Sequence, residues 1–199
     1  MKCLAAMTLL AAFTASAQAE PETYVINSGL TSSQFSFSYL GVATQTHRFE
    51  KTSGKIVLDR ASNSGSAEVT VDATSVNTGH SLLNEQIQSA DFFDTAKHPA
   101  ITFKSTRMAL NGDQWTLSGD LTIKGVTRPV SLNVSAFQCQ SHPVLKMEAC
   151  EANATVTVKR SDFNMGKYAF IAGNKVTLNL AIAAVKAQPV MHLASRDPM

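Results

Sequence analysis

The chain has 199 residues, of which 44% are hydrophobic, and a formal net charge of +2. This length is typical of one domain that can bury a sizeable core. The 17 basic and 15 acidic residues nearly balance, whereas a nucleic-acid-binding domain usually carries a basic stripe. The composition therefore argues against a nucleic-acid partner.

The first 19 residues have the pattern of a secretory signal peptide. Lys2 precedes an uncharged apolar stretch, residues 4–15, and Ala17 and Ala19 place small residues where a signal peptidase reads the chain. The apolar stretch is shorter than the ~20 residues that a membrane-spanning helix needs, so a short membrane anchor is the less favoured alternative. We predict cleavage after Ala19 and export of the remainder.

Most of the remaining chain alternates apolar and polar residues with a period of two, which is typical of half-buried β-strands. The alternation covers residues 35–39, 69–73, 101–104, 115–124, 130–135, 154–159 and 176–182, with shorter strands at 25–26, 49 and 56–58. Turn residues at 52–54, 62–65 and 124–129 separate the strands, and Asn111-Gly112 is a strong hairpin signal. Eight or more short strands predict an all-β barrel or sandwich.

One segment, residues 75–94, breaks the alternation. Apolar residues at 82, 83, 87 and 90 recur at about helical intervals, and Asn77 and Thr78 are candidates to cap a helix. We predict one short helix laid across a barrel end. Residues 20–186 then form the barrel domain, and residues 187–199, with two prolines and no alternation, form a flexible C-terminal tail.

Two cysteines, Cys139 and Cys150, remain after the predicted cleavage. Export places them in an oxidising compartment, where an even pair usually bonds. Ten residues separate them, including His142 and Pro143, which suit a turn. We predict a disulfide that closes a hairpin, because zinc would need further ligands at suitable spacing and none lie nearby.

No motif for catalysis or metal binding stands out. The five histidines show no metal-ligand spacing, and the chain has neither a Gly-x-Ser-x-Gly elbow nor a phosphate-binding loop. Residues 91–94, Asp-Phe-Phe-Asp, suggest a loop pinned into the core by its aromatic pair. Arg160 and Asp162 are expected to form a local ion pair that orders a turn. We predict no catalytic residue, no metal site and no cofactor.

Alternation alone does not decide what fills such a barrel. Eight strands enclose a space that side chains can fill completely or that can hold one ligand. Because any antiparallel barrel needs apolar alternation, a dry core is the simpler hypothesis from these patterns.

Several segments together resemble one known family. They are Tyr24–Ile26, Phe35–Phe37, Ser75–Gly79, Ser89–Asp94, Lys97–Pro99, Ile101–Ser105, Gly119–Val130 and Lys159–Phe163. Each is modest alone, but in their order and spacing, over about residues 24–186, the chain resembles the YceI-like family of periplasmic polyisoprenoid- or lipid-binding proteins. The resemblance implies a lipocalin-like, eight-stranded antiparallel barrel around a long apolar tunnel. It also implies a bacterial periplasmic location.

The chain departs from the family pattern at several polar positions. Leu30, Tyr39 and Gln86 stand where the family usually has histidine, so a head-group specificity is not carried over. Asn164 replaces a common glycine after the Ser-Asp-Phe run.

The resemblance favours a ligand cavity over a dry core, and alternation selects the side chains that face it. The predicted ligand-binding residues are Phe35, Phe37, Phe49, Val71, Ile87, Phe92, Phe93, Phe103, Leu121, Ile123 and Val156. Ile87, Phe92 and Phe93 are expected at the lid or closed end. The expected partner is a long-chain lipid or isoprenoid quinone, which the protein carries or stores.

Two other roles stay open at this point. The protein could be an enzyme that acts on an isoprenoid lipid, or a stress-related structural protein with a dry core. A transient contact with an inner-membrane protein and a homodimer are further expectations that no residue pattern decides.

Overall fold

The structure, a computed structural model, describes residues 20–111 and 114–188. The predicted signal peptide, residues 1–19, lies outside the described residues, and so does the predicted tail from residue 189 onward. No helix in the described ranges has the length and apolar character needed to cross a membrane.

Strands make up most of the described chain. In chain order the elements are β1 (Glu22–Ile26), η1 (Ser28–Leu30), β2 (Ser32–Tyr39), β3 (Ala43–Phe49), β4 (Thr52–Asp59), β5 (Ser64–Asp72), η2 (Ala73–Ser75), β6 (Val76–Asn77), α1 (Ser81–Gln88), β7 (Ala100–Asn111), β8 (Gln114–Ile123), β9 (Val126–Ser141), β10 (Glu148–Lys159), η3 (Arg160–Phe163) and β11 (Ala172–Lys186). The η elements are single 3₁₀ turns.

Eight of the strands close into a ring in the order β1-β4-β5-β7-β8-β9-β10-β11. Every neighbouring pair is antiparallel, and β1 pairs with β11 to complete the circle, with Tyr24 opposite Lys186 and Ile26 opposite Ala184. The predicted eight-stranded antiparallel barrel with one helix is confirmed. Full closure leaves none of these eight strands as an open edge along the seam.

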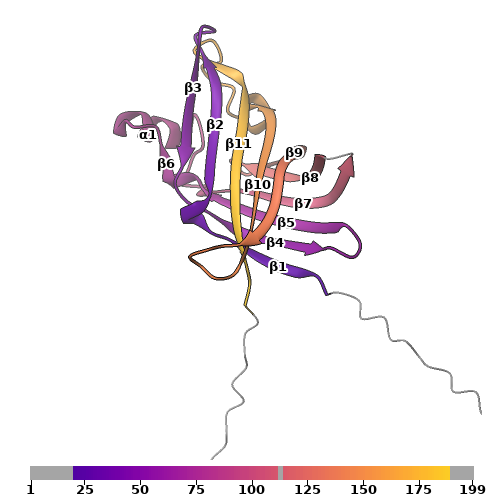
Figure 1. Ribbon diagram of the computed structural model, residues 1–199. Coiled ribbons are helices and arrows are strands. Elements are labelled where there is room, and N and C mark those ends of the chain that lie inside the picture. Colours follow the sequence, from indigo (N-terminus) through magenta and orange to yellow (C-terminus); the bar gives the residue numbers. More distant parts are fainter. Residues whose placement is uncertain (1–19, 112–113, 189–199) are drawn as a thin grey trace, which may run out of the picture.

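Three further strands extend the sheet beyond the ring as a ribbon, β2-β3-β6. The 15-residue strand β11 joins the two parts. Its C-terminal end pairs with β1, whereas its earlier part pairs with β2, with Leu178 opposite Phe35. Figure 1 shows β2 and β3 standing beside β11, while β1, β4 and β5 cross below them at a steep angle.

A network of charged side chains stabilises the place where β1 pairs with β11 and closes the ring. The Glu22 carboxylate pairs with Arg60 at 2.9 Å and with Lys186, and it accepts a hydrogen bond from the Tyr24 hydroxyl at 2.9 Å. Arg60 also pairs with Glu148 at 2.6 Å. These donors lower the pKa of Glu22 from 4.5 to about 2, and the bond from Lys186 has the largest effect. The network therefore links β1, β10 and β11 where the ring closes.

The predicted turn at residues 52–54 is wrong, because these residues begin strand β4. Gly54 sits opposite Val69 with φ +146°, and a Cβ at this position would lie 2.0 Å from the carbonyl oxygen of Glu68. The glycine allows β4 and β5 to approach closely, which is a common reason for a glycine inside a sheet. The chain turns just before it, between β3 and β4.

The helix prediction is confirmed, but its predicted caps are wrong. α1 begins after His80, which makes no side-chain capping bond. The backbone N–H and hydroxyl of Thr78 instead donate to Oδ1 of Asn84 inside the helix. Ile87 is buried, whereas Leu82 is exposed. α1 lies beside β6, at the edge of the ribbon (Figure 1).

The Asn164 departure from the family pattern has a backbone explanation. Asn164 follows η3 in the left-handed conformation, with φ 56° and ψ 33°. Glycine adopts this conformation without cost, and asparagine is one of the few other residues that visit it routinely. The substitution therefore preserves the turn.

Cys139 and Cys150 form the predicted disulfide. They face each other directly on β9 and β10, with their Cα atoms 4.0 Å apart. The bridge closes the β9–β10 hairpin, as expected from the sequence.

Candidate functional site

An apolar cavity of about 720 Å³ runs through the barrel and into the space between the ring and the ribbon. Its inner end is lined by side chains such as Leu132, Val134 and Ile182, and its outer end by Tyr39 and Tyr168. The volume lies within the ~300–1,000 Å³ that is usual for small-molecule sites. The barrel is therefore hollow, and the dry-core hypothesis does not describe it.

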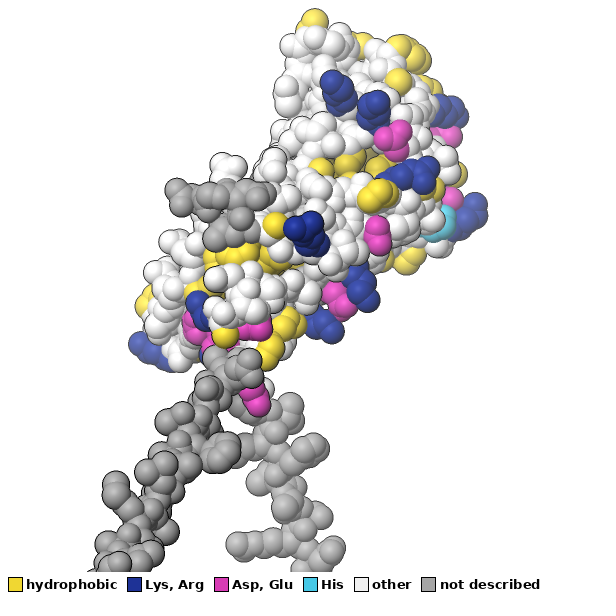
Figure 2. All heavy atoms as spheres, turned by 90° about the vertical axis from the view of Figure 1, so that its right-hand side faces the viewer, with side chains coloured by type: hydrophobic (Ala, Val, Ile, Leu, Met, Phe, Trp, Pro, Cys, Tyr) yellow, Lys and Arg dark blue, Asp and Glu magenta, His cyan; other side chains and the backbone are white. Residues whose placement is uncertain are grey.

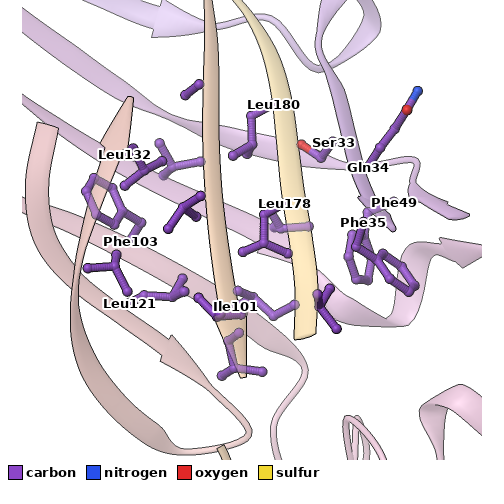
Figure 3. A pocket seen from close by; sticks show the side chains of 18 of the residues that line it. Ser33, Gln34, Phe35, Phe49, Ile101, Phe103, Leu121, Leu132, Leu178 and Leu180 are labelled. Atoms are coloured by element: carbon purple, nitrogen blue, oxygen red, sulfur yellow. The ribbon is translucent and has the colours of Figure 1, made fainter. Parts of the chain in front are cut away.

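Strand alternation places the lining side chains. Phe35 and Phe37 share one face of β2, and Leu121 and Ile123 share one face of β8. Figure 3 shows Phe103, Leu121 and Leu132 on one side of Leu178 and Leu180, with Phe35 and Phe49 on the other. All eleven predicted ligand-binding residues line the cavity. Their contact with a ligand stays a prediction.

The ribbon contributes a part of the cavity that the sequence did not reveal. Phe35, Phe37 and Phe49 come from β2 and β3, outside the eight-stranded ring. Phe93 closes this part, because its ring meets those of Phe35 and Phe49 edge-on at centroid distances of 6.0 and 5.6 Å. Together with Ile87 of α1, these residues form the aromatic wall of the cavity.

Arg160 orders the outer end of the cavity, although not through the predicted ion pair with Asp162. The guanidinium is buried and donates to three backbone carbonyls, those of Met165, Lys167 and Ala172. It also lies 5.3 Å from the centroid of the Phe92 ring. These contacts fix the loop between η3 and β11 against the cavity wall.

His47 is the polar residue that sequence reasoning missed. Its side chain lines the cavity and is only 8% exposed, with its ring 5.6 Å from Phe35 and 5.8 Å from Phe37. No described residue donates to or accepts from its ring nitrogens. Burial lowers the pKa of His47 below 6.5, so the imidazole is neutral at pH 7 and offers one donor and one acceptor. The shared parity of Gln45, His47 and Phe49 could have revealed it.

Two of the three residues at family histidine positions also reach the cavity. Tyr39 and Gln86 line it, together with Gln45. Leu30 lies in η1, half exposed and away from the cavity. Polar groups therefore gather near α1 and β3, whereas the inner end within the ring is apolar.

The described residues bring together one group of potential metal ligands, Cys139, Glu148 and Cys150. Both cysteines are in the disulfide, and a metal needs the free thiolate. What the arrangement offers chemically is burial of an apolar chain and hydrogen bonding at His47.

Comparison with curated proteins gives relatives over most of the chain. Protein YceI of Escherichia coli O157:H7 is 32% identical over 154 residues, which cover 76% of this chain and 80% of that protein. A UPF0312 protein of Pseudomonas paraeruginosa is 30% identical over 189 residues, covering 93% and 98%.

Solved structures share the fold. The crystal structure of Burkholderia cenocepacia BcnA matches with a TM-score of 0.69 and 24% identity, covering 79% of this chain and 98% of that one. A polyisoprenoid binding domain from Saccharophagus degradans, implicated in plant cell wall breakdown, matches with a TM-score of 0.60 and 19% identity, covering 82% and 98%. The family model described as YceI-like domain matches residues 24–184. The chain belongs to the YceI-like family.

Proposed function

We propose that the protein binds one long apolar lipid in its cavity, an isoprenoid chain or isoprenoid quinone, and carries or stores it in the bacterial periplasm. The observation that carries this proposal is the continuous apolar cavity of about 720 Å³ inside a YceI-like barrel. The structurally similar domain from Saccharophagus degradans is described as polyisoprenoid binding, which supports the same class of ligand.

Burial of the chain supplies the affinity. Each buried CH₂ contributes ~0.8 kcal/mol, so a five-carbon isoprene unit contributes roughly 4 kcal/mol before costs are subtracted. Association and ordering cost at least ~4 kcal/mol. Three buried units therefore leave at most roughly 8 kcal/mol, so micromolar binding is the tightest that three units alone would give. The inner part of the cavity wall, which includes Leu121, Leu132 and Leu180, is apolar.

The polar end of the cavity favours an uncharged head group. His47 is neutral and has no partner among the described residues, so a ligand carbonyl or hydroxyl can satisfy it. Gln86 and Gln45 add amide groups on the same side. Among the described residues that line the cavity, Arg160 is the one Lys or Arg, and its guanidinium already donates to three carbonyls rather than to a ligand anion.

The periplasmic part of the proposal rests on two features. The predicted signal peptide, residues 1–19, directs export. The disulfide between Cys139 and Cys150 is typical of proteins in oxidising compartments.

The test is native mass spectrometry of the protein purified from the periplasm, followed by organic extraction. We expect one long-chain lipid per protein. Phe37→Asp places a carboxylate on the cavity wall and should abolish loading, whereas the matched control Ser38→Asp, on the exposed opposite face of β2, should load normally.

Three results would overturn the proposal. A folded protein that is empty and takes up no added quinone or polyprenol removes the binding function. Normal loading of folded Phe37→Asp removes this cavity as the binding site. Conversion of a labelled prenyl or quinone substrate would favour the enzyme alternative.

A further inference from the structure

An exposed apolar tip lies at the outer end of the cavity. It consists of Tyr39, Leu40 and Val42 around the β2–β3 turn, and Tyr168 and Phe170 in the loop before β11. Val42 is 87% exposed, Phe170 78% and Leu40 54%. The two segments touch, because the Leu40 N–H donates to the carbonyl of residue 171 at 2.7 Å. Figure 2 shows hydrophobic side chains at the top of the molecule with Lys and Arg side chains close below.

The backbone of the tip is held in an unfavourable conformation. Leu40 has φ 51° and Tyr168 has φ 59°. Of the eight non-glycine residues with positive φ in the described chain, these two alone carry large apolar side chains. Glycine, asparagine and aspartate are the residues that usually adopt this left-handed conformation, and a residue such as leucine costs ~1–2 kcal/mol there.

The apolar tip is continuous with the cavity. Tyr39 and Tyr168 belong to the tip and also line the cavity, as does Ile171. A surface that contacts the tip therefore also lies next to residues that line the cavity.

Unpaired positive charge lies behind the tip. Lys159 on β10 and Lys175 on β11 face each other directly, both exposed, and neither forms an ion pair with a described residue. Like charges in directly opposed positions repel each other. The tip itself carries Lys167, whose charge is balanced by Asp91 at 2.6 Å. An anionic surface that meets the tip would relieve the repulsion between Lys159 and Lys175.

We propose that the apolar tip docks onto the surface of an anionic lipid bilayer. Leu40, Val42 and Phe170 enter the boundary between head groups and acyl chains, and Lys159 and Lys175 face the lipid phosphates. Apolar side chains on two adjacent loop tips, backed by lysines, have the chemistry of an interfacial membrane site. Docking in this orientation turns the end of the cavity that Tyr39 and Tyr168 line toward the membrane. Docking does not depend on the ligand, whereas lipid transfer at this point rests on the proposed function.

The test is flotation of the full mature protein with vesicles of phosphatidylethanolamine and phosphatidylglycerol, compared with vesicles of phosphatidylcholine alone. The triple variant Leu40→Asn, Val42→Ser, Phe170→Ser removes the apolar tip, and its asparagine suits the positive φ of the turn. We expect its partition coefficient to fall about 100-fold. The matched control is Val144→Ser, which removes a side chain that is 79% exposed in the β9–β10 loop.

The charge component is tested separately. Lys159→Gln with Lys175→Gln should weaken binding to the anionic vesicles about tenfold and leave binding to phosphatidylcholine unchanged. The proposal is overturned if the wild-type protein floats with neither vesicle, or if Val144→Ser reduces binding as much as the triple variant. Lipid extraction from the triple variant separates the two proposals, because loss of docking with a full cavity leaves the proposed function intact.

Discussion

Replacing Arg160 should destabilise the protein more than replacing any exposed charge. The guanidinium donates to three carbonyls, those of Met165, Lys167 and Ala172, and no other side chain of the described residues donates to them. A hydrogen bond that involves a charged group contributes ~1.5–3 kcal/mol. Arg160→Met keeps the length of the chain but removes every donor. Part of the loss is offset because a buried guanidinium no longer has to be desolvated.

We expect Arg160→Met to lower the free energy of unfolding by about 3–5 kcal/mol. For a domain of this size, a loss of that order lowers Tm by roughly 10 °C. Urea denaturation at pH 7 measures the free energy directly, and the slope against urea shows whether unfolding remains two-state. The matched control is Arg48→Met, because Arg48 is exposed and pairs with Glu50 at 2.8 Å. Arg48→Met should lower the free energy of unfolding by no more than about 1 kcal/mol.

A loss below about 1 kcal/mol for Arg160→Met would refute this reasoning. The carbonyls would then find equivalent partners in water from the cavity, and the buried guanidinium would not hold the loop. Arg160→Lys adds a second check. It preserves the charge, but a single ammonium cannot match a planar fork that spans three carbonyls, so we expect an intermediate loss.

Three other predictions concern the seam, the sheet and the polar end of the cavity. Glu22→Gln should lower the free energy of unfolding by about 1–2 kcal/mol at pH 7. The folded protein holds the pKa of Glu22 at about 2 instead of 4.5. The difference in unfolding free energy between wild type and variant, measured by urea denaturation, should therefore disappear as pH falls from about 5 toward 2. An unchanged difference at pH 2 would contradict this. Gly54→Ala should lower the free energy of unfolding, measured by thermal unfolding, by more than about 3 kcal/mol, because its Cβ would lie 2.0 Å from a carbonyl oxygen. Gly79→Ala has open space around its Cβ, so it should lower the same free energy by about 1 kcal/mol. Equal losses would exclude the steric cause. His47→Phe should weaken binding of a prenyl quinone about tenfold and spare an isoprenoid hydrocarbon without a head group; parallel changes in both titrations would remove His47 from head-group recognition.

The sequence predicted those features that depend on local alternation. Parity predicts that Phe103, Leu121 and Val156 face the barrel interior, the family resemblance predicts that the interior is a cavity, and all three residues line it. Parity is set within one strand, so neighbours in sequence are enough to read it. The helix that contains Ile87 can also be predicted from the sequence, because its apolar residues recur at helical intervals and those of the neighbouring strands recur every second residue.

Features that depend on contacts between distant segments could not be read in this way. The segment containing Phe35 alternates like any barrel strand, yet it lies in the ribbon, because its partner on β11 is more than a hundred residues away. The sequence predicts that Arg160 pairs with the nearby carboxylate of Asp162, since it does not show that three carbonyls converge on the guanidinium. It predicts a turn at Gly54, because a glycine that permits close strand approach looks the same in sequence as one that permits a turn.

The position of β11 as the last of the described strands affects the order of folding. β10, β1 and β2 all pair with it, and at the point where β1 gives way to β2 the Thr31 hydroxyl both accepts from the Ala183 N–H and donates to its carbonyl. The ring therefore cannot close, and the ribbon cannot join it, before the ribosome has passed Lys186. Contacts of such large sequence separation form slowly. A nascent chain made in this order keeps the ring open until β11 has been synthesised.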